Sequence, residues 1–140
     1  MIIAVCSLDI PEWMFYDYFK GLCRKEAVIL AIQPKGFDPR QQMKSADFEL
    51  QYKRDSYLKD VELHHHDFFE IYFLLAGDVT YLIESKIVHV MPGVLLLISP
   101  RELHQVLIKP EMSVYERYVL WMDPQMIQRL SSPLTDLTRG

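Results

Sequence analysis

Apolar and polar residues alternate at short intervals between residues 48 and 122, a pattern typical of a two-layer β structure. Successive side chains of a strand point to opposite faces, so alternation places one face on a core and the other toward water. The sequence therefore predicts an all-β sandwich or barrel. Its predicted strands are 48–52, 61–64, 71–75, 79–84, 87–90, 94–98, 103–108 and 114–122.

Three local patterns refine this prediction. The run at residues 71–75 is apolar throughout, so we expect that strand to be buried on both faces. Ser85-Lys86 separates two apolar runs and predicts a two-residue hairpin connection. Near the end of the chain, Asp123 is expected to cap a helix that begins at Pro124 and continues to about residue 130.

The first 42 residues follow a different pattern. Residues 1–6 predict a short strand, residues 11–24 an amphipathic helix with Phe15 and Phe19 on its apolar face, and residues 27–32 a second strand. We therefore divide the chain into a small N-terminal α/β extension at 1–42 and a β domain at 43–140. The extension is expected to pack on the barrel or on a second subunit.

Composition narrows the classes of function. The net charge of −4 and pI near 5.7 give no general attraction to phosphate backbones, so we expect no direct DNA binding by this chain alone. No apolar run is long enough to cross a bilayer, and residues 1–6 lack the charged start of a secretory signal. Cys6 and Cys23 fit free thiols in a reducing compartment. We expect a cytoplasmic location.

A cluster of histidines precedes the apolar run at 71–75. On an extended segment His64 and His66 point to the same side and His65 to the other, and Glu70 can join the pair from the next strand. Two imidazoles and a carboxylate form a ligand set for a divalent iron, manganese, nickel or zinc ion. His104, which follows another buried strand, is a fourth candidate ligand. The alternative is a metal-free polar cluster, hydrogen-bonded internally or to an organic ligand.

Other side chains are candidates for lining a cavity. Aromatic walls with a few polar groups suit a small ligand, although the same residues also fill the interior of a small barrel. Arg117 could hold a ligand carboxylate, or it could pair with Glu116, Asp67 or another acid. His65 is expected at the surface and His89 in a structural role. The candidate ligand-binding residues are Tyr72, Tyr81, Arg117 and Trp121.

The spacing His64-x-His66-x-x-x-Glu70, followed by a Pro-Gly turn and His104, resembles the two cupin motifs. The segments HHHDFFEIYFLLAGDVTYLIESK, PGVLLLISPRELHQV and YERYVLWMDPQMIQRLSS resemble the N-terminal effector-binding domain of AraC-type transcription regulators, from about residue 43 onward. The resemblance implies a cupin double-stranded β-helix, or jelly-roll barrel, with a C-terminal helix and a ligand inside the barrel. Two positions depart from the cupin pattern: Leu58 replaces a glycine and Val94 replaces an acid.

Three functions follow from these observations. The resemblance implies an effector-binding and dimerisation module, a homodimer that binds a sugar or small carboxylate, with a separate helix-turn-helix unit reading DNA. The ligand set alternatively suits a metal-dependent cupin enzyme of the oxygenase or isomerase type, although no catalytic acid or base stands out besides the cluster. A structural or dimerising domain with a filled barrel is the third alternative.

Overall fold

We describe residues 6–7, 39–55, 61–109 and 113–137 from a computed structural model of the chain. The predicted helix at 11–24 and strand at 27–32 lie outside the described residues, and the domain boundary at residue 43 stays a prediction. The described elements are β1 (Cys6–Ser7), β2 (Phe48–Asp55), β3 (Phe69–Ala76), β4 (Val79–Ile83), β5 (Lys86–Val90), β6 (Val94–Ile98), β7 (His104–Ile108), β8 (Tyr115–Met122) and α2 (Pro124–Leu130).

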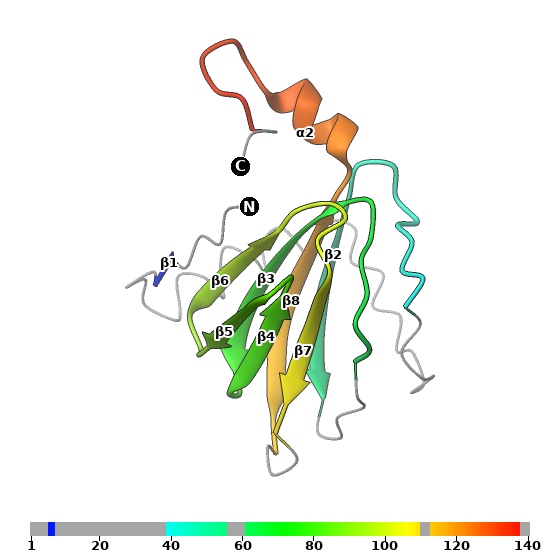
Figure 1. Cartoon of the computed structure of the whole chain (residues 1–140). Coiled ribbons are helices and arrows are strands. Elements are labelled where there is room, and N and C mark those ends of the chain that lie inside the picture. The colour runs from blue at the N-terminus through cyan, green and yellow to red at the C-terminus, as the bar shows by residue number, and fades with distance from the viewer. Residues whose placement is uncertain (1–5, 8–38, 56–60, 110–112, 138–140) are drawn as a thin grey trace.

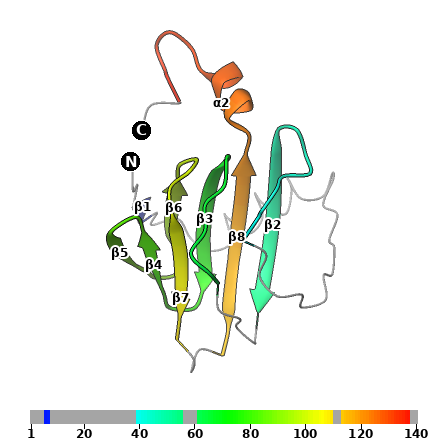
Figure 2. The same cartoon turned by 45° about the vertical axis from the view of Figure 1, so that its right-hand side comes forward.

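The strands form two antiparallel sheets that face each other (Figures 1 and 2). One sheet has five strands in the order β1-β6-β3-β8-β2, and the other has three in the order β5-β4-β7. Strands that are neighbours in the larger sheet, such as β3 and β8, are far apart in the sequence, so the chain crosses repeatedly between sheets. This is the jelly-roll arrangement that the alternating pattern and the family resemblance predicted.

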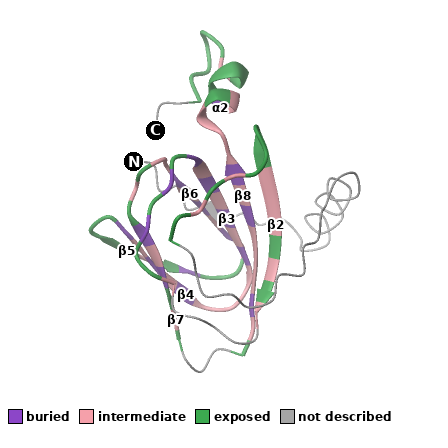
Figure 3. Cartoon of the chain, turned by 90° about the vertical axis from the view of Figure 1, so that its right-hand side faces the viewer, coloured by how far each residue is buried: buried purple, intermediate pink, exposed green. Residues whose placement is uncertain are grey.

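The core lies between the sheets (Figure 3). Tyr72 and Leu74 of β3 are completely buried there, whereas Ile71, Phe73 and Leu75 on the outer face are only partly buried. The prediction that residues 71–75 are buried on both faces was therefore wrong for the outer face. An apolar run cannot by itself distinguish a strand covered on both sides from one with a half-covered outer face.

The predicted strand at 61–64 is also absent, and only His64 forms a ladder pair, with His104. His64 N donates to His104 O at 3.1 Å, and His104 N donates to His64 O at 2.9 Å. At Val61 the carbonyl instead accepts from the Gln105 side-chain Nε2 at 2.8 Å. A side chain thus replaces the backbone partner that a longer strand would need.

The hairpin turn lies one residue earlier than predicted. Ile83 pairs with Lys86, so Glu84-Ser85 forms the connection. Glu84 has a φ of 52°, in the left-handed region that few side chains favour. Its backbone N donates to Leu103 O at 2.7 Å and its Oε1 accepts from Leu103 N at 2.8 Å. These contacts with another part of the chain hold Glu84 at the turn.

The C-terminal helix begins as predicted. The Asp123 carboxylate accepts hydrogen bonds from the backbone N of Gln125 at 2.8 Å and of Met126 at 3.2 Å, and Pro124 occupies the first turn. Helix α2 extends beyond the end of β8 (Figure 1). No helix among the described residues has the length and hydrophobicity to cross a membrane.

Leu74→Ala should lower the free energy of unfolding by about 2–5 kcal/mol, because it removes a completely buried side chain from a packed core. Ile87→Ala is the matched control, since Ile87 is 75% exposed on β5 and its substitution should change the free energy by less than about 0.5 kcal/mol. Urea denaturation followed by circular dichroism measures both. Equal effects of the two substitutions would contradict the assigned core.

Candidate functional site

Four buried polar residues meet at one end of the space between the sheets. His64 and His66 lie in the segment before β3, Glu70 is the second residue of β3, and His104 is the first residue of β7. Their exposed fractions are 8% for His64, 4% for His66, 6% for Glu70 and 1% for His104. The backbone pairing of His64 with His104 brings the first histidine segment beside the start of β7. The burial of so many polar groups requires that they be paired or bind a ligand.

A backbone carbonyl two residues away fixes each histidine ring. The Nδ1 atoms of His64, His66 and His104 lie 2.8 Å from the carbonyl oxygens of Glu62, Phe68 and Glu102, respectively. A carbonyl can only accept a hydrogen bond, so each Nδ1 carries a proton. In the neutral ring this tautomer leaves Nε2 with a lone pair, as in histidines that bind metals.

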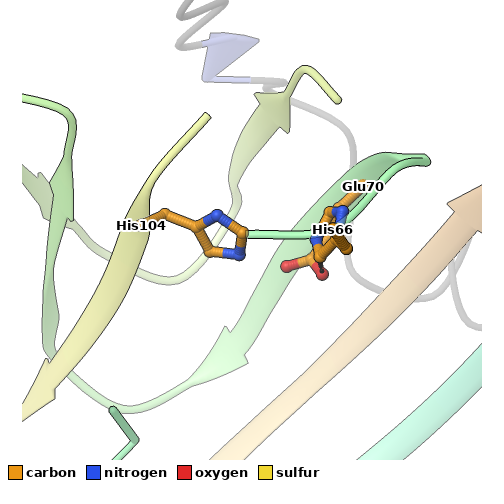
Figure 4. A group of neighbouring side chains, drawn as sticks. All are labelled: His66, Glu70 and His104. Carbon is orange, nitrogen blue, oxygen red and sulfur yellow. Dashed lines mark ion pairs between the residues drawn. The ribbon is translucent and has the colours of Figure 1, made fainter. Parts of the chain in front are cut away.

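His66, Glu70 and His104 form the tightest group, and one ligand atom from each lies within 4.8 Å of the others (Figure 4). The Nε2 of His104 is buried and has no hydrogen-bond partner among the described residues. His64 borders this group, with its ring centroid 4.3 Å from that of His104. The structure therefore brings the four predicted ligands together, three of them closely.

The contact between His66 and Glu70 requires a positive charge. His66 Nε2 lies 3.3 Å from Glu70 Oε2. If His66 is neutral, a lone pair faces a carboxylate oxygen, and two acceptors repel at this distance. A second proton on His66 or a bound metal ion removes this conflict. The donor set thus fits a divalent cation, with a proton as its competitor.

The pKa values of the cluster favour an ionised Glu70 and neutral rings at His64 and His104. Burial alone would raise the pKa of Glu70, but the hydrogen bond from His66, the charges of His104 and His66, and the Trp121 indole lower it to about 2. Trp121 Nε1 donates to Glu70 Oε2 at 2.8 Å. Burial lowers the pKa of His104 to about 4 and also lowers that of His64. At neutral pH these two rings can offer lone pairs to a cation.

A cavity of about 100 Å³ extends from this cluster between the sheets. His64, Glu70 and His104 lie on its wall, and His66, which does not line it, contacts Glu70. All four candidate ligand-binding residues line it: Tyr72, Tyr81, Arg117 and Trp121. His65 is exposed, and His89 lies outside the cavity with its Nε2 3.4 Å from Asp78 Oδ1.

Tyrosines form a hydroxyl network on the cavity wall. The Tyr72 hydroxyl donates to that of Tyr115 at 3.0 Å, and the Tyr72 and Tyr81 rings pack with centroids 4.9 Å apart. Burial raises the pKa of all three phenols, so they remain protonated donors. Phenol groups on an apolar wall can both shape a small ligand site and offer it hydrogen bonds.

Arg117 has a structural partner that the sequence analysis did not name. Its Nη1 donates to Asp55 Oδ2 at 2.6 Å, and its guanidinium lies 3.8 Å from the Tyr115 ring centroid. The acids named as alternatives are elsewhere: Asp67 pairs with Arg101 at 3.5 Å, and Glu116 accepts from the Tyr52 hydroxyl at 2.5 Å. Asp55 is the partner because β2 and β8 are neighbours in the sheet.

Sequence analysis missed Lys53, which lines the same cavity. Lys53 lies opposite Arg117 in the β2–β8 ladder, and opposite residues share a face of the sheet. The apolar side of β2 points outward instead, leaving Phe48 49% and Tyr52 51% exposed. The sequence of β2 alternates between apolar and polar residues, and this pattern predicts that the apolar residues face the interior. Only the strand pairing shows that the polar residues face inward.

The fold and its inner site define a cupin barrel. Residues 46–139 match the AraC-like ligand binding domain, and the chain belongs to that family. No curated protein matches the sequence.

Solved cupin structures share the fold. A cupin 2 conserved barrel domain protein from Salinispora arenicola is 23% identical, with 60% of this chain and 70% of that chain covered and a TM-score of 0.50. A cupin protein from Bacteroides fragilis is 16% identical, with coverages of 74% and 92% and a TM-score of 0.52. An RmlC-like cupin with a double-stranded β-helix from Methanocaldococcus jannaschii is 8% identical, with coverages of 60% and 77% and a TM-score of 0.51. These similarities show the fold alone.

Proposed function

We propose that this domain binds a small-molecule effector inside its barrel and serves as the sensor part of an AraC-type transcription regulator. The observation that carries the proposal is the cavity between the sheets, on which polar groups from β2, β3, β7 and β8 converge. Family membership in the AraC-like ligand binding domain supports the same role. DNA recognition in such a regulator belongs to a separate helix-turn-helix unit.

The proposed effector is a sugar or small carboxylate that the cavity encloses in part. Its volume of about 100 Å³ is below the roughly 150 Å³ of an engineered protein cavity that holds benzene, so the enclosed part of the ligand has only a few heavy atoms. Phenol and indole groups provide apolar walls, while Arg117 and the histidine cluster provide polar contacts. Such a mixture fixes the orientation of a small polar ligand.

A divalent iron, manganese, nickel or zinc ion is a proposed second component of this site. His66, Glu70 and His104 would hold it, with His64 as a fourth ligand from the adjoining segment. Bound there, the ion would supply a Lewis acid for an oxygen of the effector. Trp121 supports the cluster by donating its indole hydrogen to Glu70.

The same cluster favours a second candidate function, a metal-dependent cupin enzyme. The residues nearest in sequence that could act as an additional acid or base, Asp67 and Glu102, do not line the cavity. Asp67 pairs with Arg101, and Glu102 accepts from Ser99 N at 2.8 Å. The enzyme function is therefore less well supported than the sensor function, because neither acid lies where it could contact a ligand in the cavity.

We also propose that the domain forms a homodimer through α2 and the segment after it. Leu130 is 61% exposed, Leu134 97% and Leu137 48%. Apolar side chains exposed together on a helix and its continuation are typical of surfaces that a partner covers. A cytoplasmic location remains part of this proposal, since a transcription regulator acts where DNA is.

Val119→Phe should prevent effector binding, because Val119 is 5% exposed and lines the cavity. A thermal-shift screen of sugars and small carboxylates should find a ligand that raises the melting temperature of the wild type but not of this variant. Leu120→Phe is the control, since its neighbouring side chain points to the other face of β8. A ligand that stabilises all three proteins equally would bind outside the barrel.

His66→Ala should abolish metal binding because it removes one of three convergent ligands. Purified protein, exchanged against iron, manganese, nickel and zinc in turn and then desalted, is analysed by plasma mass spectrometry. The wild type and the exposed neighbouring variant His65→Ala should each retain near-stoichiometric amounts of one metal. Stoichiometric metal in His66→Ala, or none in the wild type, would contradict the proposed centre.

The double substitution Leu130→Glu, Leu134→Glu should convert a dimer into a monomer, because it places charge on both sides of an apolar contact. Sedimentation velocity measures the change. Leu107→Glu is the control, since Leu107 is 43% exposed on β7, away from α2. A dimer that survives the double substitution would exclude α2 as the interface.

A further inference from the structure

Lys53 brings a positive charge to the cavity that no described acid neutralises. Its side chain lines the cavity from β2, and its ammonium lies 5.8 Å from the centroid of the Trp121 ring. In the described part of the chain, no carboxylate forms an ion pair with Lys53. Burial and the charge of the neighbouring Arg117 lower the pKa of this ammonium, and the opposing influence of the Glu70 and Asp55 charges does not reverse that shift. An anion beside Lys53 would offset both effects.

The positive charge of Arg117, in contrast, is already paired within the protein. Its guanidinium already donates to Asp55 at 2.6 Å and to the carbonyl of Tyr115 at 3.3 Å, and it stacks on the Tyr115 ring. The Asp55 carboxylate balances its charge. Of the two cations that lie opposite each other in the β2–β8 ladder, Lys53 is therefore the one whose charge is available to a ligand.

The negative charge on the same wall is also balanced. Glu70 accepts from Trp121 Nε1 at 2.8 Å and lies 3.3 Å from His66 Nε2, where a proton or a metal ion provides the positive charge. Glu70 is therefore poorly suited to serve as the partner of Lys53. In the cavity wall, Arg117 is therefore paired with Asp55, and Glu70 with Trp121 and His66. Among the described residues, Lys53 is the charged group of this wall that has no ion-pair partner.

We propose that Lys53 anchors the effector and that the effector is a small carboxylate and not a neutral sugar. This inference rests on the proposed function of the barrel as a ligand site. The carboxylate binds the Lys53 ammonium, and the Tyr115 hydroxyl, which accepts from Tyr72, can donate its own proton to the same ligand. The remainder of the molecule extends toward the histidine cluster.

The test compares acids with their neutral amides. Isothermal titration at constant ionic strength measures the affinity of acetate, lactate and succinate against acetamide, lactamide and succinamide. In the wild type at least one acid should bind about tenfold or more tightly than its amide, since a hydrogen bond to a charged group is lost in the amide. Lys53→Met should abolish this preference, and Lys53→Arg should largely keep it.

Lys86→Met is the matched control, because Lys86 is exposed on β5 and should leave every affinity unchanged. Equal binding of acids and amides by the wild type, or acid affinities unchanged in Lys53→Met, would overturn the anchor. If sugars or amides bind and Val119→Phe removes that binding, the barrel is a ligand site and only the role of Lys53 is wrong. If no compound in either screen binds, both proposals are wrong.

Discussion

The paired backbone hydrogen bonds between His64 and His104 are the constraint on which the site depends. They join the segment before β3 to the first residue of β7 and so connect residues that are forty positions apart in the chain. Together with the hydrogen bond from Arg101 N to His66 O at 2.8 Å, this pair sets the His104 ring beside His66 and Glu70. Hydrogen bonds from each Nδ1 to a nearby carbonyl then orient the rings. Position comes from a long-range contact and ring orientation from local ones.

Charge balance explains why so polar an interior is compatible with a stable barrel. Burying an unpaired charge is costly, and the cavity wall satisfies most of its charges internally. Asp55 neutralises Arg117, while the Trp121 indole and a positive charge near His66 stabilise Glu70. Lys53 and the Nε2 of His104 line the cavity without such a partner among the described residues. A ligand or ion that binds these two groups therefore gains the most free energy.

The cavity exists because β2 presents its polar side to the interior. Glu49, Gln51, Lys53 and Asp55 lie opposite the inward residues of β8, whereas the apolar residues of β2 point outward. Had the strand been paired in the other register, its apolar residues would have filled the barrel, since a one-residue shift exchanges the two faces. A filled barrel was the third function considered from the sequence. The observed register instead supports a binding domain.

Sequence alone determined the features that depend on short-range chemistry. Alternation identified most strands, Asp123 and Pro124 fixed the start of α2, and the spacing from His66 to Glu70 predicted that these two side chains would meet once the chain turned into β3. Tertiary structure decided what depends on partners far along the chain. Asp55 pairs with Arg117 across 62 positions, Leu103 holds the turn at Glu84, and β8 gives Lys53 its inward direction. No local pattern encodes these, because each depends on which strands become neighbours.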